Sequence, residues 1–327
     1  MKKRLVLHIG SHKTATSFLQ SSFLASPDVL SGLGVLYPLT GRAYGGHFKL
    51  CWALKDPDFA GRTLLDIPVW SDLVAEIDTS PHATALISAE SFGWGTDVSR
   101  LGVLAKHYDV QVIYYLRSPD SHLESFYNQI VKDYGTREHR TLEQYMAEEP
   151  LGILDTTKLL TPWDEMFGRA AIKLRLFGKA FLPQGIMADF LQTMGFATIP
   201  TFNDPADTTL QKVSLPPDAL EYLRLSNPWL TDPKGHHDFV LRLVQLTQKH
   251  PDAFQQTRAG LLSQRGRQIL RARFRANQLQ AIHSYHGPGR TPFPPNDAPD
   301  TADYATRLPE ANSHVMGKVA ALIRGIV

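Results

Sequence analysis

The chain has 327 residues, enough for one large domain or two small ones. Its composition, 43% hydrophobic and 20% charged, is typical of a globular protein, and its net charge of +2 does not favour broad nucleic-acid binding. The one cysteine, Cys51, excludes an internal disulfide and favours a reducing compartment. We find no run of about 18 apolar residues and no signal-peptide pattern, so we expect a cytoplasmic protein without an integral membrane segment.

Short apolar runs bounded by glycine, proline or polar residues predict strands. They cover residues 5–9, 83–88, 110–116 and 171–177, with a further strand or turn at 34–38. Apolar residues at helical spacing predict helices between these strands. These helices follow the loop at 10–17, cover 69–77 and 186–194, and extend from Pro119 to Gly135. The alternation predicts a parallel sheet with helices on both faces.

The last third of the chain has helical patterns and no strand pattern. These patterns cover residues 218–226, 236–249, 262–285 and 310–325. We therefore expect residues 1–200 to form the α/β core, and residues 201–327 to form a helical extension packed on it as one integrated domain.

The stretch RLVLHIGSHKTATSFLQ, residues 4–20, predicts a strand, a tight loop and a helix. A loop that leads into a helix points unpaired backbone N–H groups and the positive end of the helix dipole at one spot. Lys13 adds a cation there, and Thr14, Thr16 and Ser17 add hydroxyl groups. This chemistry indicates a cradle for a phosphate-like anion; the alternative is that the hydroxyl groups only cap the helix.

An ordinary nucleotide hydrolase loop has the pattern G-x-x-x-x-G-K-[ST]. Here Gly10 stands three residues before Lys13, and no second glycine precedes the lysine. The sequence therefore disfavours such a hydrolase. Two further polar residues follow predicted strands, Glu90 after 83–88 and Arg117 after 110–116. Open α/β sheets place ligand chemistry at such strand ends.

Two motifs, HIGSHKTATSFLQ and YYLRSPDSHLESFYNQ, together resemble those of sulfotransferases that use 3′-phosphoadenosine 5′-phosphosulfate (PAPS). The first resembles the phosphosulfate loop of that family. The second carries Arg117 and, eight positions on, Ser125, which is the spacing of the family's second motif. The chain is similar to the bacterial carbohydrate or exopolysaccharide group of the family. The resemblance implies a P-loop-like three-layer sandwich and an enzyme of the EC 2.8.2 type.

The resemblance also implies roles for individual residues. Lys13 would neutralise the charge on the leaving oxygen. The 5′-phosphate would be held by the segment 14–17, which contains Ala15 and its hydroxyl-bearing neighbours. His12 could touch the sulfuryl oxygens. Arg117 and Ser125 would hold the 3′-phosphate. PAPS would be the co-substrate, and no metal is required. The family usually has glycine where this chain has Ala15; we expect Ala15 to lie in the first helical turn, where alanine is harmless.

The acceptor hydroxyl needs a general base. Glu90 is the first candidate and His47, in the glycine-rich loop 41–50, is the second. The structural alternatives are an ion pair or helix cap for Glu90 and an ordinary histidine for His47. We expect His8 to be a packed histidine at a strand end.

The acceptor is predicted less directly. A carbohydrate follows only from the resemblance, and another hydroxyl-bearing acceptor, such as a phenol, lipid or peptide, stays open. The aromatic residues Tyr44, Trp52, Phe92 and Trp94 could form a platform for sugar rings or belong to the core. A basic segment, Arg137, His139 and Arg140, could contact an anionic acceptor or be merely solvated.

Two other classes of function remain open on the sequence. One is a nucleotide-dependent kinase of P-loop descent, against which the missing glycine counts. The other is a non-catalytic protein that keeps the nucleotide site, an alternative that Ala15 leaves open.

Overall fold

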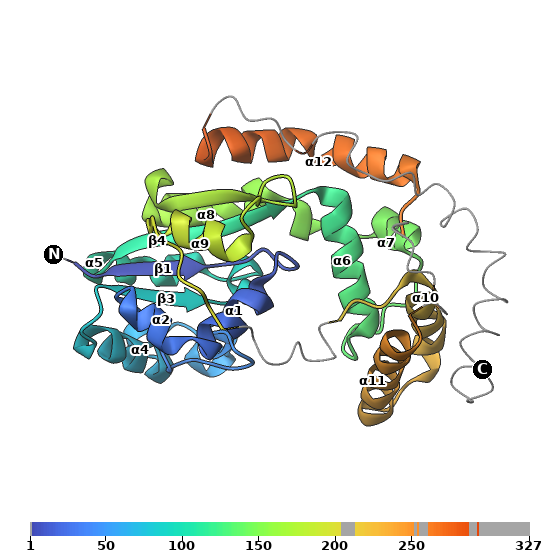
Figure 1. The fold of residues 1–327 in the computed structure, drawn as a ribbon, viewed down its shortest axis with the longest axis horizontal. Coiled ribbons are helices and arrows are strands. Elements are labelled where there is room, and N and C mark those ends of the chain that lie inside the picture. The colour runs from blue at the N-terminus through green and yellow to red at the C-terminus, as the bar shows by residue number, and fades with distance from the viewer. Residues whose placement is uncertain (1, 204–212, 252–253, 255–260, 288–292, 294–327) are drawn as a thin grey trace. The chain divides into compact units, whose positions relative to one another are not determined.

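The computed structural model describes residues 2–203, 213–251, 254, 261–287 and 293 (Figure 1). The helix predicted at 310–325 lies outside these residues. Contacts within the chain divide it into two units. Among the described residues, the first contains 2–117, 155–203 and 276–287, and the second contains the rest of them. This division differs from the predicted boundary at residue 200, because the helical segment 118–154 belongs to the second unit.

A five-stranded sheet forms the centre of the first unit. Its strands are β1 (Arg4–His8), β2 (Val35–Leu36), β3 (Thr84–Ser88), β4 (Asp109–Arg117) and β5 (Ile172–Phe177). Their order is β2-β3-β1-β4-β5, and every neighbouring pair is parallel. All five residues of β3 are buried, which explains why its central residues, Ala85 to Ile87, form an uninterrupted apolar run. The predicted α/β fold with a parallel sheet is confirmed.

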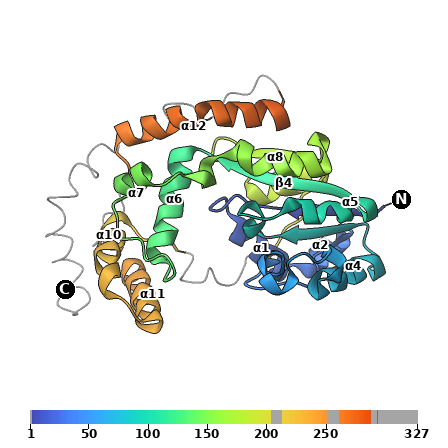
Figure 2. The same ribbon diagram turned by 180° about the vertical axis from the view of Figure 1, so that it is seen from behind.

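Helices cover both faces of the sheet. On one face, α1 (Thr16–Ala25), α2 (Pro27–Gly32) and α9 (Ile186–Thr193) pack on a core that includes Val6, Leu86 and Tyr115. The Tyr115 hydroxyl donates to Asp189 of α9 at 2.8 Å, whereas the adjacent Tyr114 is hydrogen-bonded to Thr156 at the start of α8 (Thr156–Phe167). Because successive strand residues point to opposite faces, α8 lies on the other face (Figure 1, and from behind in Figure 2).

Three more helices belong to the first unit: α3 (Phe48–Lys55), α4 (Pro68–Thr79) and α5 (Leu104–His107). The predicted helix at 69–77 corresponds to α4. The sequence patterns gave no prediction for α8, which contains Pro162 within its length. Proline lacks the backbone N–H that a helix interior uses, so it masks a helical pattern.

The second unit is helical. It contains α6 (Pro119–Lys132), α7 (Leu142–Glu148), α10 (Pro217–Ser226), α11 (Pro233–Lys249) and the first part of α12 (Gln264–Tyr285). Its core is built from side chains of these helices, among them Leu123, Leu223, Leu243 and Leu270. The helices predicted between 119 and 285 are confirmed in their order and approximate bounds.

Candidate functional site

The candidate site lies at the carboxyl end of the sheet, where β1 has β3 on one side and β4 on the other. His8, the last residue of β1, pairs with Ser88 of β3 and Ile113 of β4. The chain leaves β1 towards β2 and later returns to form β4 on the opposite side of β1. This strand order makes β1 the topological switch point, at which open α/β sheets bind ligands.

The loop from β1 to α1 continues along β4 before it turns. The N–H of Tyr115 donates to the carbonyl of Gly10 at 2.9 Å, and the Ser11 hydroxyl donates to the carbonyl of Tyr115 at 3.0 Å. Thr14 and Thr16 are buried, and both hydroxyl groups donate to the carbonyl of Ser11, at 2.7 and 3.3 Å. These two hydroxyl protons therefore brace the loop. The donors available to an anion are the backbone N–H groups at the start of α1.

Ala15 is the residue before α1, and its backbone is left-handed, with φ 61° and ψ 21°. The expectation that it lies in the first helical turn is wrong. The helix begins at Thr16, and the loop needs a positive φ at position 15 to turn into it. Lys13 also has a positive φ, 64°. A left-handed alanine brings Cβ close to a carbonyl oxygen, so this position favours glycine.

Ala15→Gly should therefore stabilise the protein. A left-handed alanine costs ~1–2 kcal/mol, and the entropy of glycine in the unfolded chain offsets about half of that, which leaves a gain of about 1 kcal/mol or less. The melting temperature in a thermal scan tests this expectation. A lower melting temperature for the variant would contradict the assigned backbone conformation.

Glu90 lies against the loop. It opens a short 3₁₀ turn, Glu90–Gly93, directly beyond β3, and the N–H of Ala89 donates to the carbonyl of His8. Gly10 has φ 103°, and a Cβ built on it would lie 3.1 Å from Cβ of Glu90. Gly10 is thus needed for its conformation and for this close approach. Burial lowers the pKa of both Lys13 and His12, and the negative charge of Glu90 opposes that shift in each, so the structure brings these three residues together.

Two cations meet at the loop. Arg117, the last residue of β4, donates from Nη1 to the carbonyl of Lys13 at 2.7 Å, and its guanidinium lies 5.6 Å from the ring centroid of Phe177. Burial lowers the pKa of Lys13 and the charge of Arg117 lowers it further, whereas Glu90 opposes both. A half-buried lysine beside an arginine favours a bound anion, which would relieve their repulsion. Ser125, the predicted partner of Arg117, is a half-buried residue of α6 in the second unit.

The lowered pKa of Lys13 predicts a pH dependence of anion binding. The charged form of Lys13 attracts the anion, and it is lost as pH rises through a pKa below the ordinary value of 10.5. For the nucleotide that the sequence motifs imply, adenosine 3′,5′-bisphosphate (PAP), we therefore expect affinity to fall between neutral and alkaline pH. Calorimetric titrations across that range test the expectation. In Lys13→Arg the dependence should vanish, because a guanidinium does not titrate there; an unchanged dependence would assign it to another group.

His47 has a structural position. It is fully buried, its Nε2 donates to the carbonyl of Pro38 at 2.9 Å, and its Nδ1 accepts from the N–H of Ser88 at 3.2 Å. Burial lowers its pKa to about 4. With both ring nitrogens occupied and the ring neutral, His47 is not placed to take a proton from an acceptor. The prediction of His47 as the second candidate base does not fit this geometry. The residue is a structural link between Pro38, in the loop after β2, and Ser88 of β3.

His8 is the packed strand-end histidine that the sequence predicted. It is fully buried, and its ring lies edge-on to Phe190, with 5.1 Å between the centroids. Its Nδ1 is 2.9 Å from Oγ of Ser88. Burial lowers its pKa to about 3, so the ring is neutral.

Exposed aromatic side chains lie on α3 and the loop before it. Tyr44 is 82% exposed and Trp52 is 48% exposed, with ring centroids 6.3 Å apart, and Phe48 stacks on Trp52. We call these three residues the aromatic ledge. Trp94, 47% exposed, meets the ring of His12 edge-on, at 5.9 Å between centroids. Phe92, which the sequence left open as a platform residue, is buried between Trp70 and Trp163 and belongs to the core.

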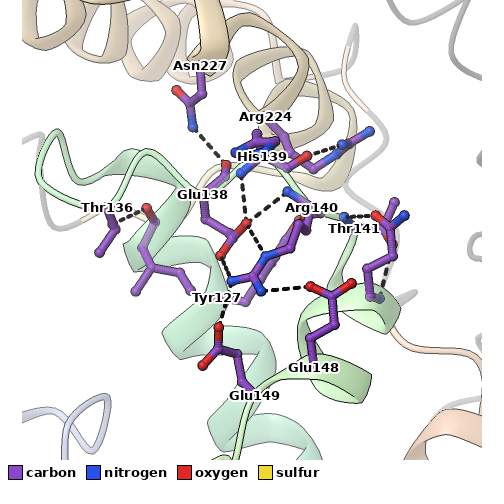
Figure 3. A network of polar contacts seen from close by, with 12 residues as sticks. Tyr127, Thr136, Glu138, His139, Arg140, Thr141, Glu148, Glu149, Arg224 and Asn227 are labelled. Carbon is purple, nitrogen blue, oxygen red and sulfur yellow. Dashed lines mark hydrogen bonds and ion pairs between the residues drawn. The ribbon is translucent and has the colours of Figure 1, made fainter.

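The basic segment of the second unit is used within that unit (Figure 3). Arg140 pairs with three carboxylates, Glu138 at 2.6 Å, Glu149 at 2.8 Å and Glu148 at 2.9 Å. Arg137 donates to the carbonyl of Leu230 at 3.0 Å, and the carbonyl of His139 accepts from Arg224. The interpretation of this segment as a contact for an anionic acceptor therefore does not fit Arg140, because its charge is compensated by three carboxylates within the unit.

One side chain of the site had no sequence signal. Gln20, on the second turn of α1, is buried, and its amide nitrogen lies 3.3 Å from Oε2 of Glu90. From sequence alone, a glutamine inside a predicted helix is expected to be an ordinary surface residue. No spacing pattern relates Gln20 to Glu90, which is 70 positions later.

Within the described residues, no group of three or more His, Cys, Asp or Glu side chains lies close enough together to hold a metal ion. None of the described helices is long and apolar enough to span a membrane.

No family model and no curated protein matches this chain. Among solved structures it is similar to a sulfotransferase from Alicyclobacillus acidocaldarius, with 15% sequence identity and a TM-score of 0.41. The likeness covers 71% of this chain and 97% of that one. A likeness this distant carries no inference of its own, so the function rests on the residues of the site.

Proposed function

We propose that this protein is a PAPS-dependent sulfotransferase that transfers a sulfuryl group to a hydroxyl of a carbohydrate. The observation that carries the proposal is the juxtaposition, at the switch point of a parallel sheet, of an anion-binding loop, two cations and one carboxylate. Lys13, Arg117 and Glu90 come from the ends of three neighbouring strands, β1, β4 and β3. The sequence motifs around Lys13 and Arg117 favour PAPS over other phosphate donors.

The donor set fits a nucleotide with a phosphosulfate. The N–H groups at the start of α1 and Nζ of Lys13 would bind the 5′-phosphate and the bridging oxygen. Arg117 would bind a second anionic group of the nucleotide while it holds the carbonyl of Lys13. We propose, from the motif alone, that this group is the 3′-phosphate and that Ser125 is the other ligand.

The chemistry requires the acceptor oxygen, the sulfur and the leaving phosphate oxygen to lie nearly in line. The acceptor oxygen forms a bond to sulfur, its proton passes to the carboxylate of Glu90, and the bond from sulfur to the phosphate oxygen breaks, which releases PAP. Lys13 stabilises the negative charge that grows on that leaving oxygen. The close approach of Gly10 to Glu90 supports this role, because it keeps the loop and the side chain of Glu90 near each other.

The aromatic ledge supports a carbohydrate acceptor. Tyr44 and Trp52 offer exposed flat rings, with the half-buried ring of Phe48 stacked on Trp52, and large exposed rings that lie together are a feature of binding surfaces. A pyranose ring presents an apolar face of C–H groups that fits such a surface, while its hydroxyl groups stay free to reach Glu90.

Trp52→Ala should weaken acceptor binding. The KM for an oligosaccharide that the wild type sulfates should rise roughly five- to tenfold, because one aromatic contact contributes ~1 kcal/mol, while kcat and PAP affinity stay unchanged. Trp229→Ala is the matched control, since Trp229 is 84% exposed and lies in the second unit. An unchanged KM in Trp52→Ala would show that the aromatic ledge is not part of the acceptor site.

Incubation with PAPS and a panel of hydroxyl acceptors tests the function itself. The proposal predicts that PAP forms and that a saccharide gains a sulfate ester, without added divalent cation. A protein that binds PAP but sulfates no member of the panel would support the non-catalytic alternative. Phosphorylation of an acceptor by ATP and magnesium would support the kinase alternative.

A further inference from the structure

The amide of Gln20 is fixed between Glu90 and Ser88. Gln20 is 1% exposed. Its Nε2 lies 3.3 Å from Oε2 of Glu90, 3.2 Å from Oγ of Ser88 and 3.4 Å from the carbonyl of Ser88. A carboxylate and a carbonyl accept hydrogen bonds and cannot donate them. The nitrogen of the amide must therefore face these groups, because the amide oxygen in its place would repel them.

The anchor behind Gln20 belongs to the sheet. Oγ of Ser88 also meets Nδ1 of His8, at 2.9 Å, and both residues are fully buried at the paired ends of β1 and β3. The His8 ring is held by the edge-on contact with Phe190. Gln20 is thus tied on one side to two strand ends, which leaves its other hydrogen bond to orient Glu90.

The loop before α3 closes the remaining space around the amide. A Cβ built on Gly46 would lie 2.6 Å from Nε2 of Gln20 and 2.8 Å from Cε2 of Phe48. The backbone of Gly46 therefore packs directly on the amide, and any side chain there would push Gln20 out of place. This packing and the hydrogen bonds to Ser88 hold Gln20 in one position.

We propose that Gln20 is a positioning residue that aims the carboxylate of Glu90 at the acceptor hydroxyl. The inference rests on the proposed function, in which Glu90 is the base. Gln20 follows Thr16 by one turn of α1, so the helix whose first N–H groups face the donor also carries the side chain that orients the base. One rigid element then sets the distance between the leaving group and the base, and this distance decides whether the reacting atoms lie in line.

A double-mutant cycle tests the role. Gln20→Leu removes the hydrogen bond and keeps the volume, and it should lower kcat roughly 10- to 100-fold, because small displacements of a catalytic group cost up to about this much. The Kd for PAP should not change, because the donor contacts stay in place. In the Glu90→Gln background, Gln20→Leu should lower kcat no further, since the residue that Gln20 positions no longer acts as a base. An equal loss in both backgrounds, or no loss in either, would overturn the proposal.

Gly46→Ala gives a second route that leaves Gln20 itself intact. Its Cβ should displace the amide and reproduce the loss in kcat, again only where Glu90 is present. Full activity in Gly46→Ala would contradict the inference even if Gln20→Leu failed to fold. A wild type without any PAPS turnover would reject the proposed function, and this inference with it. A wild type that turns over and is impaired by Glu90→Gln, but shows additive losses in the cycle, would reject the role of Gln20 alone.

Discussion

Lys13→Ala should lower kcat by at least ~10²–10³-fold, the usual cost of removing one group that stabilises the charge of a transition state. Lys13 is the cation at the turn of the loop. Arg117 fixes its backbone through the carbonyl, and the charge of Glu90 opposes the lowering of its pKa by burial and by Arg117. The variant loses the ammonium group that compensates the leaving oxygen. PAP affinity should fall as well, because the product carries the same phosphate.

The backbone should not confound this result. Lys13 has a positive φ, and alanine makes the same steric demand there as lysine does. Lys158→Ala is a matched control, because Lys158 is an exposed lysine of α8 in the first unit. It should retain both activity and PAP affinity. Normal turnover in Lys13→Ala would contradict the assignment of this loop as the binding site of the sulfuryl donor.

Glu90→Gln should lower kcat by ~10²–10⁴-fold, the range over which a general base contributes. Glutamine keeps the size of the side chain and an oxygen that accepts from Gln20, but it cannot take the acceptor proton. PAP affinity should not fall, because the change removes a negative charge beside Lys13. Steady-state kinetics and a PAP titration on the same preparation separate the two effects.

An unchanged kcat in Glu90→Gln would contradict the assignment of the base. His47 would not be a replacement, since both of its ring nitrogens are used within the fold. We therefore expect His47→Gln to change the stability of the fold rather than kcat/KM for the acceptor. This contrast distinguishes the two residues that the sequence left as candidates.

The parallel sheet was predictable because its central strands are buried on both faces and are largely apolar. β3 and β4 are the clearest examples. Glu90 follows shortly after the end of β3, and Arg117 is the last residue of β4. The switch point also follows from chain order once the strands are known. By contrast, α8 was hidden by Pro162. The grouping of the segment 118–154 with the second unit was not predicted, because its helices follow a core strand without a break in the pattern.

Local sequence predicted the types of site residues better than their conformations. Ala15 gave no sign that its backbone is left-handed, because that conformation is imposed by the path of the loop along β4. The contacts of Gln20, His47 and Arg140 join segments distant in sequence, or several carboxylates at once, and no periodicity encodes such contacts.

Calorimetric titration with PAP beside 5′-AMP and ATP, without divalent cation, tests the central claim most directly. The account predicts tight binding of PAP and a large loss of affinity for 5′-AMP, because the 3′-phosphate contributes charge-assisted hydrogen bonds of its own. Equal affinity for PAP and 5′-AMP would contradict the proposal that Arg117 binds the 3′-phosphate. A preference for ATP with magnesium would reject the sulfotransferase and favour the kinase.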